Sequence, residues 1–219
     1  MRSALEHISS IELIQLTYCE NCMRSAPDLL LGLPISMPLV LDMDGTLIAG
    51  DMLFKSFIAN IRRNPLIAIS CAGWLIRGRA FLKSQLAARY HVEWASVQFH
   101  KEVVDLAIRE KNAGRTVVIA TAADVAIATT VASKLGFIDR VFASDGERNY
   151  KGAAKAQVLE EAFPGGFIYA GDSAADLAIW KQASGIVLVN VRESVAEAAR
   201  KLERPVLELS AHTKVGAVL

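Results

Sequence analysis

Short hydrophobic runs alternate with longer stretches of helical spacing along most of this chain. Five runs rich in β-branched residues predict strands at residues 38–41, 116–120, 140–143, 167–170 and 186–189. Between the later runs, apolar residues recur three and four positions apart, which predicts helices at 125–135, 153–162, 174–182 and 194–202. Strands that alternate with helices are typical of a parallel sheet, so we predict an α/β fold.

The interval between the first two predicted strands breaks this alternation. After the acidic turn that follows the first strand, residues 47–115 make a connection of 69 residues, several times more than a simple β-α-β connection needs. It contains helical patterns but no convincing strand, with helices expected at 52–61, 66–76 and 80–90. Ligands bind at the carboxyl ends of parallel strands, and the interval follows one such end. We therefore predict three parts. Residues 1–36 form an N-terminal extension whose role the pattern does not indicate. Residues 37–46 and 116–219 form an α/β core, and residues 47–115 form an inserted helical cap.

Composition and charge exclude several classes of protein. The 24 basic residues nearly balance the 23 acidic ones, so we expect no broad field that attracts nucleic acid. Apolar residues make up 53% of the chain, but its longest uncharged runs, 29–41 and 64–76, are shorter than the roughly 18 residues that span a bilayer. Residues 1–6 lack the pattern of a signal peptide, so we predict a cytoplasmic protein.

The cysteines do not indicate a metal site. Three cysteines without an export signal favour a reducing compartment. Cys19 and Cys22 form a single C-x-x-C pair with no second pair and no nearby histidine. A structural zinc ion needs four ligands, so we assign no metal to this pair.

Polar residues follow four of the five predicted strands. In chain order they are Asp42, Asp44, Thr121, Lys151, Asp172 and Asp176. Because parallel strands end at one edge of a sheet, we expect these side chains to share a pocket. Three carboxylates at one place are unfavourable unless a cation binds or protons are retained, and oxygen ligands beside a phosphate suit Mg²⁺. Hydroxyl and ammonium groups suit phosphate oxygens, so the residues favour phosphoryl transfer with an aspartate nucleophile.

This order of motifs resembles the haloacid dehalogenase superfamily of phosphatases and phosphotransferases. The matching positions are D-x-D-G-T at 42–46, a threonine that ends a hydrophobic strand at 121, Lys-Gly at 151–152 and G-D-x-x-x-D at 171–176. The resemblance covers about residues 38–212. It implies a Rossmann-like parallel sheet with a cap inserted directly after the first motif, where this chain has its insertion.

The resemblance also implies roles for the acidic residues. Asp42 would attack phosphorus, and Asp44 would protonate the leaving group and then activate water. Mg²⁺ would be bound by the Asp42 side chain, the Asp44 backbone carbonyl and the Asp172 side chain. Asp176 and Gly45 would support this arrangement.

For the phosphate and the rest of the substrate, the resemblance implies fewer residues. Thr121 and Lys151 would hold the phosphate group. Asp51 resembles a substrate-contacting carboxylate of phosphoserine-phosphatase-like members. We assign Lys155, four positions after Lys151, to a solvated helix face. The implied substrate is a small phosphorylated molecule.

A narrower resemblance concerns one group within the superfamily. Segments 74–80, 144–146, 151–155 and 169–177 look like the haloacid dehalogenase domains found fused before UbiA-type polyprenyltransferase domains. No membrane domain follows in this chain, so it is either a stand-alone relative or part of a longer protein. The resemblance connects the expected phosphatase with isoprenoid or prenyl-transfer metabolism.

Two other hypotheses stay open alongside the enzyme. One is a catalytically weak accessory or regulatory domain that partners a membrane prenyltransferase. A phosphorylatable receiver domain also uses clustered aspartates and a lysine, but it has no long insertion after its first strand, so segment 47–115 counts against it. The other concerns the apolar segment 66–76, which has basic residues on both sides. We expect a buried cap helix there, and the alternative is contact with a membrane surface or a prenyltransferase domain. The pattern does not indicate an oligomeric state.

Overall fold

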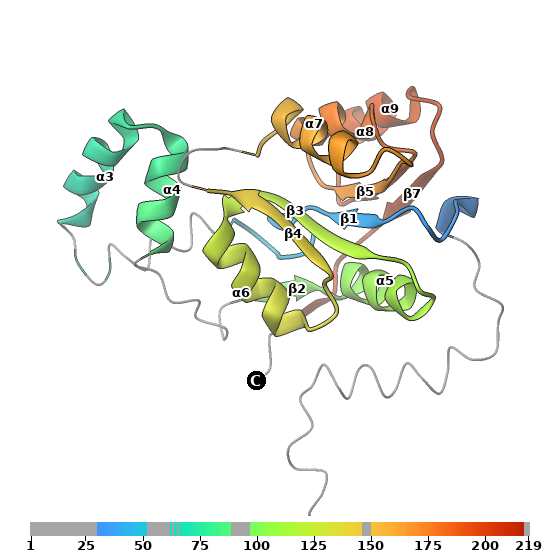
Figure 1. The fold of residues 1–219 in the computed structure, drawn as a ribbon, viewed down its shortest axis with the longest axis horizontal. Helices are drawn as coiled ribbons and strands as arrows, with labels where there is room; N and C mark the ends of the chain where they lie inside the picture. Colours follow the sequence, from blue (N-terminus) through green and yellow to red (C-terminus); the bar gives the residue numbers. More distant parts are fainter. Residues whose placement is uncertain are drawn as a thin grey trace, which may run out of the picture.

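A six-stranded parallel sheet forms the centre of the protein (Figure 1). The computed structural model describes residues 30–51, 62, 64, 66–88, 97–145 and 150–216, so Cys19 and Cys22 lie outside the described part. The strand order is β4-β3-β1-β5-β6-β7. The strands are β1 (Leu39–Leu41), β3 (Val117–Asp124), β4 (Arg140–Ser144), β5 (Ile168–Gly171), β6 (Gly185–Val189) and β7 (Val206–Leu209). The predicted α/β fold is confirmed, and β7 is a sixth strand that the pattern does not predict.

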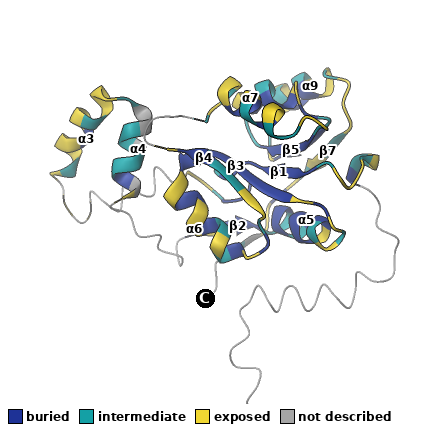
Figure 2. Cartoon of the chain, in the orientation of Figure 1, coloured by how far each residue is buried: buried dark blue, intermediate teal, exposed yellow. Residues whose placement is uncertain are grey.

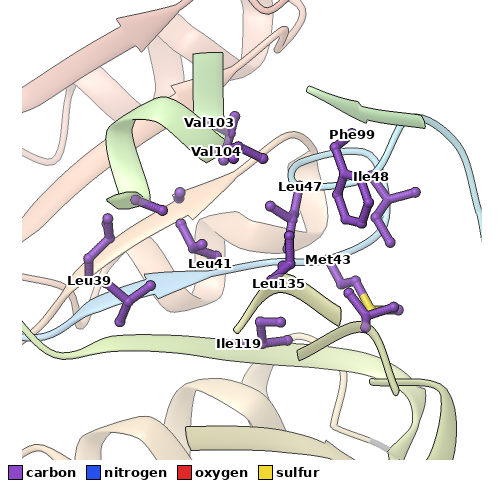
Figure 3. Packing of buried hydrophobic residues seen from close by; sticks show 14 of the residues in the cluster. Leu39, Leu41, Met43, Leu47, Ile48, Phe99, Val103, Val104, Ile119 and Leu135 are labelled. Carbon is purple, nitrogen blue, oxygen red and sulfur yellow. The ribbon is translucent and has the colours of Figure 1, made fainter. Parts of the chain in front are cut away.

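Helices cover both faces of this sheet (Figure 1). One face carries α5 (Lys101–Asn112) and α6 (Val125–Leu135); the other carries α7 (Ala153–Ala162), α8 (Leu177–Trp180) and α9 (Glu193–Arg200). Residues along β1 alternate between the two layers. Leu39 and Leu41 belong to the hydrophobic cluster on the α5 side (Figure 3), whereas Val40 belongs to the cluster on the α7 side. All three side chains are fully buried, so β1 holds the loop that follows it on a rigid support.

The loop after β1 is fastened by a second, small sheet. Strand β2 (Gln98–His100) pairs with β8 (Lys214–Gly216) in antiparallel orientation. Phe99 also bridges Ile48, and the His100 backbone N–H donates to the Leu47 carbonyl at 3.0 Å. The buried His100 ring donates from Nδ1 to the Thr46 carbonyl oxygen at 2.8 Å. These bonds fix the residues that follow the first motif.

The end of the predicted cap belongs to the core. Val97, Phe99 and Val103 are buried in the same cluster as Leu39, so the boundary predicted at residue 115 lies too late in the chain. The reason is physical: the apolar residues of α5 recur on one face, as in a helix that packs on a sheet. The described cap helices are α3 (Ile67–Ile76) and α4 (Arg79–Ala87), close to their predicted positions. The helix expected at 52–61 lies outside the described residues.

The last residues of the predicted N-terminal extension are bound to the core through Arg115. This side chain is fully buried, and its Nε donates to Glu110 Oε2 at 2.8 Å. Its remaining nitrogens donate to the backbone carbonyls of Leu33, Pro34 and Met37 at 2.6–3.2 Å. A buried guanidinium needs such partners, so Arg115 fixes the chain just before β1.

Candidate active site

A cavity of about 790 Å³ opens at the carboxyl edge of the sheet, beneath the cap. Its lining includes all eight residues that the sequence assigns to the site: Asp42, Asp44, Gly45, Asp51, Thr121, Lys151, Asp172 and Asp176. The cap helices contribute Leu75 and Leu82 to the same cavity. The structure therefore brings together groups that are up to 134 positions apart in the chain, from Asp42 to Asp176.

The first and fourth motifs touch at Gly45. This residue has a φ of +84°, and its N–H donates to the Ile48 carbonyl at 2.9 Å within the tight turn after β1. A Cβ at this position would lie only 2.2 Å from Oδ2 of Asp172. Glycine is needed both for the left-handed backbone and for the close approach of the Asp172 carboxylate.

Lys155 forms an ion pair with the expected nucleophile. Its Nζ lies 2.6 Å from Oδ1 of Asp42, and the lysine is only 4% exposed. The same ammonium group donates to the Tyr169 hydroxyl at 2.8 Å. The assignment of Lys155 to a solvated helix face is therefore wrong. Lys151, one helical turn earlier, is exposed at the cavity wall.

Asp176 orders the loop of the fourth motif. Its Oδ2 accepts from the backbone N–H of Asp172 at 3.2 Å and from the backbone N–H and hydroxyl of Ser173, both at 3.1 Å. Its Oδ1 accepts from the Tyr169 hydroxyl at 3.1 Å. A Cβ on Gly171 would lie 2.8 Å from the Asp176 carboxyl carbon. Four donors on one buried carboxylate hold the Asp172 backbone in place.

Tyr169 connects the Lys155–Asp42 ion pair with Asp176 of the fourth-motif loop. Its position in the sequence does not indicate this role. The side chain is fully buried on β5, where an aromatic residue is expected to fill the core. Its hydroxyl receives a hydrogen bond from Lys155 and gives one to Asp176. Lys155, the ion-pair partner of Asp42, and Asp176 of the fourth-motif loop thus contact the same buried phenol.

Thr121 and Asp51 occupy different depths of the cavity. Thr121 is 1% exposed, and its hydroxyl oxygen accepts from the Ala123 backbone N–H at 3.0 Å. This bond orients the hydroxyl and leaves its hydrogen to donate to an anion. Asp51 is exposed at the cavity wall, toward the start of the cap.

Burial and crowding perturb the carboxylates. Burial is the largest cause that raises the pKa of Asp42, and the neighbouring Lys155 charge opposes it. Burial, followed by the charges of Asp42 and Asp176, raises the pKa of Asp172 to about 7. Without a cation, the cluster therefore retains a proton near neutral pH.

The donor set suits Mg²⁺ but does not form a cage of side chains. Within the described ranges, no three His, Cys, Asp or Glu side chains form a metal-binding group. Magnesium usually binds proteins through one or two carboxylates and keeps several waters. Asp42, Asp44 and Asp172 line one cavity, where the carboxylates of Asp42 and Asp172 and the backbone carbonyl of Asp44 would provide such a set of oxygens. Burial and the charges of Asp42 and Asp176 raise the pKa of Asp172, and a cation bound beside it would lower that pKa.

Comparison with known proteins places this arrangement in a family. Residues 39–181 match the haloacid dehalogenase-like hydrolases. The chain belongs to this family. The matched segment begins with β1 and ends just after the fourth motif, so it includes both motifs that carry the acidic residues.

A longer relative matches most of this haloacid dehalogenase-like hydrolase. The uncharacterized protein y4nM of Sinorhizobium fredii (strain NBRC 101917 / NGR234) is 42% identical over 153 residues. The match covers 70% of this chain and 30% of y4nM, so the chain corresponds to about a third of that relative. The predicted relation to UbiA fusions stays a prediction.

Two solved structures share the fold at low identity. Phosphoserine phosphatase in its apo form has a TM-score of 0.56 at 16% identity, covering 80% of this chain and 94% of that one. A phospho-aspartyl intermediate analogue of phosphoserine phosphatase has a TM-score of 0.51 at 16% identity, covering 78% and 92%. At such identities the likeness shows the fold alone.

Proposed function

We propose that this hydrolase cleaves phosphate monoesters with Mg²⁺ through an aspartyl-phosphate on Asp42. One observation carries the proposal: a buried lysine holds one Asp42 oxygen at 2.6 Å, at the bottom of a cavity that Asp44, Thr121 and Asp172 also line. The ion pair favours the ionised form of Asp42, which a nucleophile requires, and so opposes the effect of burial on its pKa. The solved phospho-aspartyl analogue of a phosphatase with the same fold supports this choice.

The reaction divides into two displacements at phosphorus. A carboxylate oxygen of Asp42 forms a bond to phosphorus while the bond to the ester oxygen breaks, and Asp44 donates a proton to that oxygen. Asp44 then takes a proton from water, which attacks phosphorus and releases phosphate and free Asp42. Mg²⁺, bound through Asp42, Asp172 and the Asp44 carbonyl, would neutralise phosphate charge.

The remaining lining residues would position the substrate. Thr121 donates its hydroxyl hydrogen, and Lys151 places its ammonium group near the phosphate. Asp51 would contact a polar part of the substrate. Leu75 and Leu82 give the cap side an apolar wall, which favours a phosphate ester with an apolar group, such as an isoprenoid.

A panel of phosphate esters tests the proposal. Phosphate release is measured with Mg²⁺ for sugar phosphates, phosphoamino acids, nucleotides and polyprenyl phosphates. We expect one class to be hydrolysed, and we expect Asp42→Asn to abolish that hydrolysis while the protein still melts cooperatively. If no substrate is hydrolysed faster by the natural protein than by Asp42→Asn, the proposal fails.

A second candidate is an accessory domain with little turnover that partners a membrane prenyltransferase. The match to only 30% of a longer relative and the exposed apolar residues of α3 favour it. Calorimetric titration separates the two: Mg²⁺ binding without hydrolysis of any ester on the panel supports the accessory role.

A further inference from the structure

Helix α3 exposes an apolar face at the outer end of the molecule (Figure 1). Leu66 is 69% exposed, Ile69 73% and Ile76 88%. At 100° per residue, positions 66, 69, 73 and 76 share one side of a helix. This side therefore has Gly73 between the large side chains and no polar residue among the four. Figure 2 shows the exposed residues along α3, in contrast to the buried strands of the core.

This face is not explained by packing within the described chain. Of the residues of α3, only Cys71 is buried, whereas the sequence predicts a buried cap helix. Soluble monomers rarely expose large contiguous apolar patches, and such patches mark interaction sites. The cap helix prediction is correct in position and wrong in burial.

The charge of the inserted segment points to the chemistry of the partner. In sequence, residues 52–92 carry seven Lys and Arg and no Asp or Glu, whereas the rest of the chain has 17 basic and 23 acidic residues. Although the total charge is near neutral, the inserted segment is basic and the rest of the chain is acidic. Arg62 and Arg77, which precede and follow the apolar segment in the sequence, are both exposed.

A lipid surface fits both properties. Apolar side chains flanked by basic ones bind the boundary between headgroups and acyl chains, where the cations meet anionic lipid. Ten residues give α3 a length of about 15 Å, too short to span a bilayer. No helix in the described part of the chain is long and apolar enough to do so. Helix α3 would therefore lie on the surface.

The position of α3 also relates the surface to the cavity. Leu75 lies on the same helix as Ile69 and Ile76, is 50% exposed and lines the cavity with the acidic residues. We propose that the Leu66–Ile69–Ile76 face of α3 binds an anionic membrane surface through its apolar side chains and flanking arginines. This interaction is independent of hydrolysis, so its test is separate from that of the proposed function.

Vesicle flotation tests the interaction. The purified chain is mixed with phosphatidylcholine vesicles that contain either no phosphatidylglycerol or about a third of it. We expect flotation with the anionic vesicles at 0.1 M salt, and a loss of at least severalfold in the bound fraction at 0.5 M salt because the attraction is screened. Absence of flotation with anionic vesicles, or equal binding to both vesicle types, would overturn the proposal.

Matched variants locate the contact. We expect Ile69→Glu/Ile76→Glu to lower the vesicle partition coefficient at least about tenfold, and Arg62→Gln/Arg77→Gln to lower it severalfold. Ile35→Glu is the control, since Ile35 is an apolar residue outside the cap that is 38% exposed. We expect this variant to bind vesicles like the natural chain. Unchanged flotation of Ile69→Glu/Ile76→Glu contradicts the assigned face.

Sedimentation of the same variants without vesicles covers the other occupant of such a face. If the natural chain shows no vesicle binding but forms dimers that Ile69→Glu/Ile76→Glu abolishes, the face is a self-association surface and the membrane proposal is wrong. A monomer that floats with anionic vesicles supports the proposal.

Discussion

The core edge and the cap helix α3 line the same cavity with opposite distributions of polar and apolar groups. At the core edge, charged side chains are buried: Asp42 is 8% exposed and Lys155 4%. On α3, apolar side chains are exposed: Ile69 is 73% exposed and Ile76 88%. Each departs from the usual distribution, in which charges face water and aliphatic groups do not. Burying a charge or exposing an aliphatic side chain lowers the stability of the fold. Such residues therefore indicate a requirement other than stability, such as catalysis or binding.

The two regions differ in how their unusual residues are compensated. Asp42 has Lys155, and Asp176 has four hydrogen-bond donors, so the core edge satisfies its charges internally. Ile69 and Ile76 gain little from the described chain, so their compensation lies with a partner. Substitutions should therefore harm stability and chemistry at the core edge and leave both intact on α3.

Removing Lys155 should have the largest effect. We expect Lys155→Met to lower kcat/KM by about 10²-fold or more, because the Asp42 carboxylate loses its ion pair and the charge that favours its ionised form. It should also lower the free energy of unfolding by about 3 kcal/mol, since the buried Asp42 carboxylate is left without its cationic partner. Enzyme kinetics and urea unfolding measure the two effects.

Lys151→Met is the matched control for this change. Because Lys151 is exposed, its loss should alter stability by less than about 0.5 kcal/mol and act mainly by raising KM. A larger loss of kcat for Lys151→Met than for Lys155→Met would contradict the placement of Lys155 at the nucleophile.

Adding a methyl group at Gly45 should be the next most harmful change. The Cβ of Gly45→Ala would displace the Asp172 carboxylate, and the left-handed backbone would be strained by roughly 1–2 kcal/mol. We expect a Mg²⁺ affinity at least about tenfold weaker, measured by calorimetry. Gly165→Ala is the control, because Gly165 faces open space and has no left-handed φ. Equal Mg²⁺ affinity in the two variants would show that the contact has no role in metal binding.

The pH dependence of metal-free stability should be smaller but specific. The pKa of Asp172 is about 7 in the folded protein, against an ordinary value of 3.8. Between these values the folded state holds a proton that the unfolded chain has released. The free energy of unfolding should therefore fall as the pH rises from about 4 through about 7, and Mg²⁺ should restore it most at high pH.

Urea unfolding in EDTA at pH 5 and pH 8 measures this slope. Asp172→Asn should flatten it, because the group that takes up the proton is removed. An identical slope in the natural chain and in Asp172→Asn would mean that Asp172 does not titrate as described.

On α3, the same kind of measurement should give the smallest effect. We expect Ile69→Glu/Ile76→Glu to change the free energy of unfolding by less than about 0.5 kcal/mol per site and to leave hydrolysis of a small soluble ester unchanged. Thermal unfolding and steady-state kinetics check both points. A strongly destabilised variant would show that these side chains support the cap and would remove the contrast between the two regions.

The sequence places the acidic residues of the candidate site at one edge of the sheet, where the structure also has them, because strand ends are easy to locate. Asp42 and Asp172 follow hydrophobic runs that become β1 and β5, and parallel strands bring such ends to one edge. Lys155 is missed because its spacing fits a helix surface as well as a buried pair. The available signal is that it is one turn after Lys151 and surrounded by alanines, which leave room for a lysine to turn inward.

The parts of the fold that the sequence does not predict depend on long-range contacts. Residues 98–112 follow the helical patterns of the insertion, and only the pairing of β2 with β8 and the burial of Phe99 show that they belong to the core. The exposure of Ile76 cannot be predicted from the sequence either, because an apolar helix has the same sequence pattern whether the core of its own chain or a partner covers it.

The formation of a covalent phosphoenzyme tests the central claim most directly. A hydrolysed ester is mixed with the natural chain and Mg²⁺, the reaction is quenched in acid within its first turnover, and the peptides are examined by mass spectrometry. We predict phosphate on the peptide that contains Asp42, and none in Asp42→Asn. Rapid turnover with no phosphorylated peptide, or phosphate on a peptide without Asp42, would contradict the assignment of Asp42 as the nucleophile.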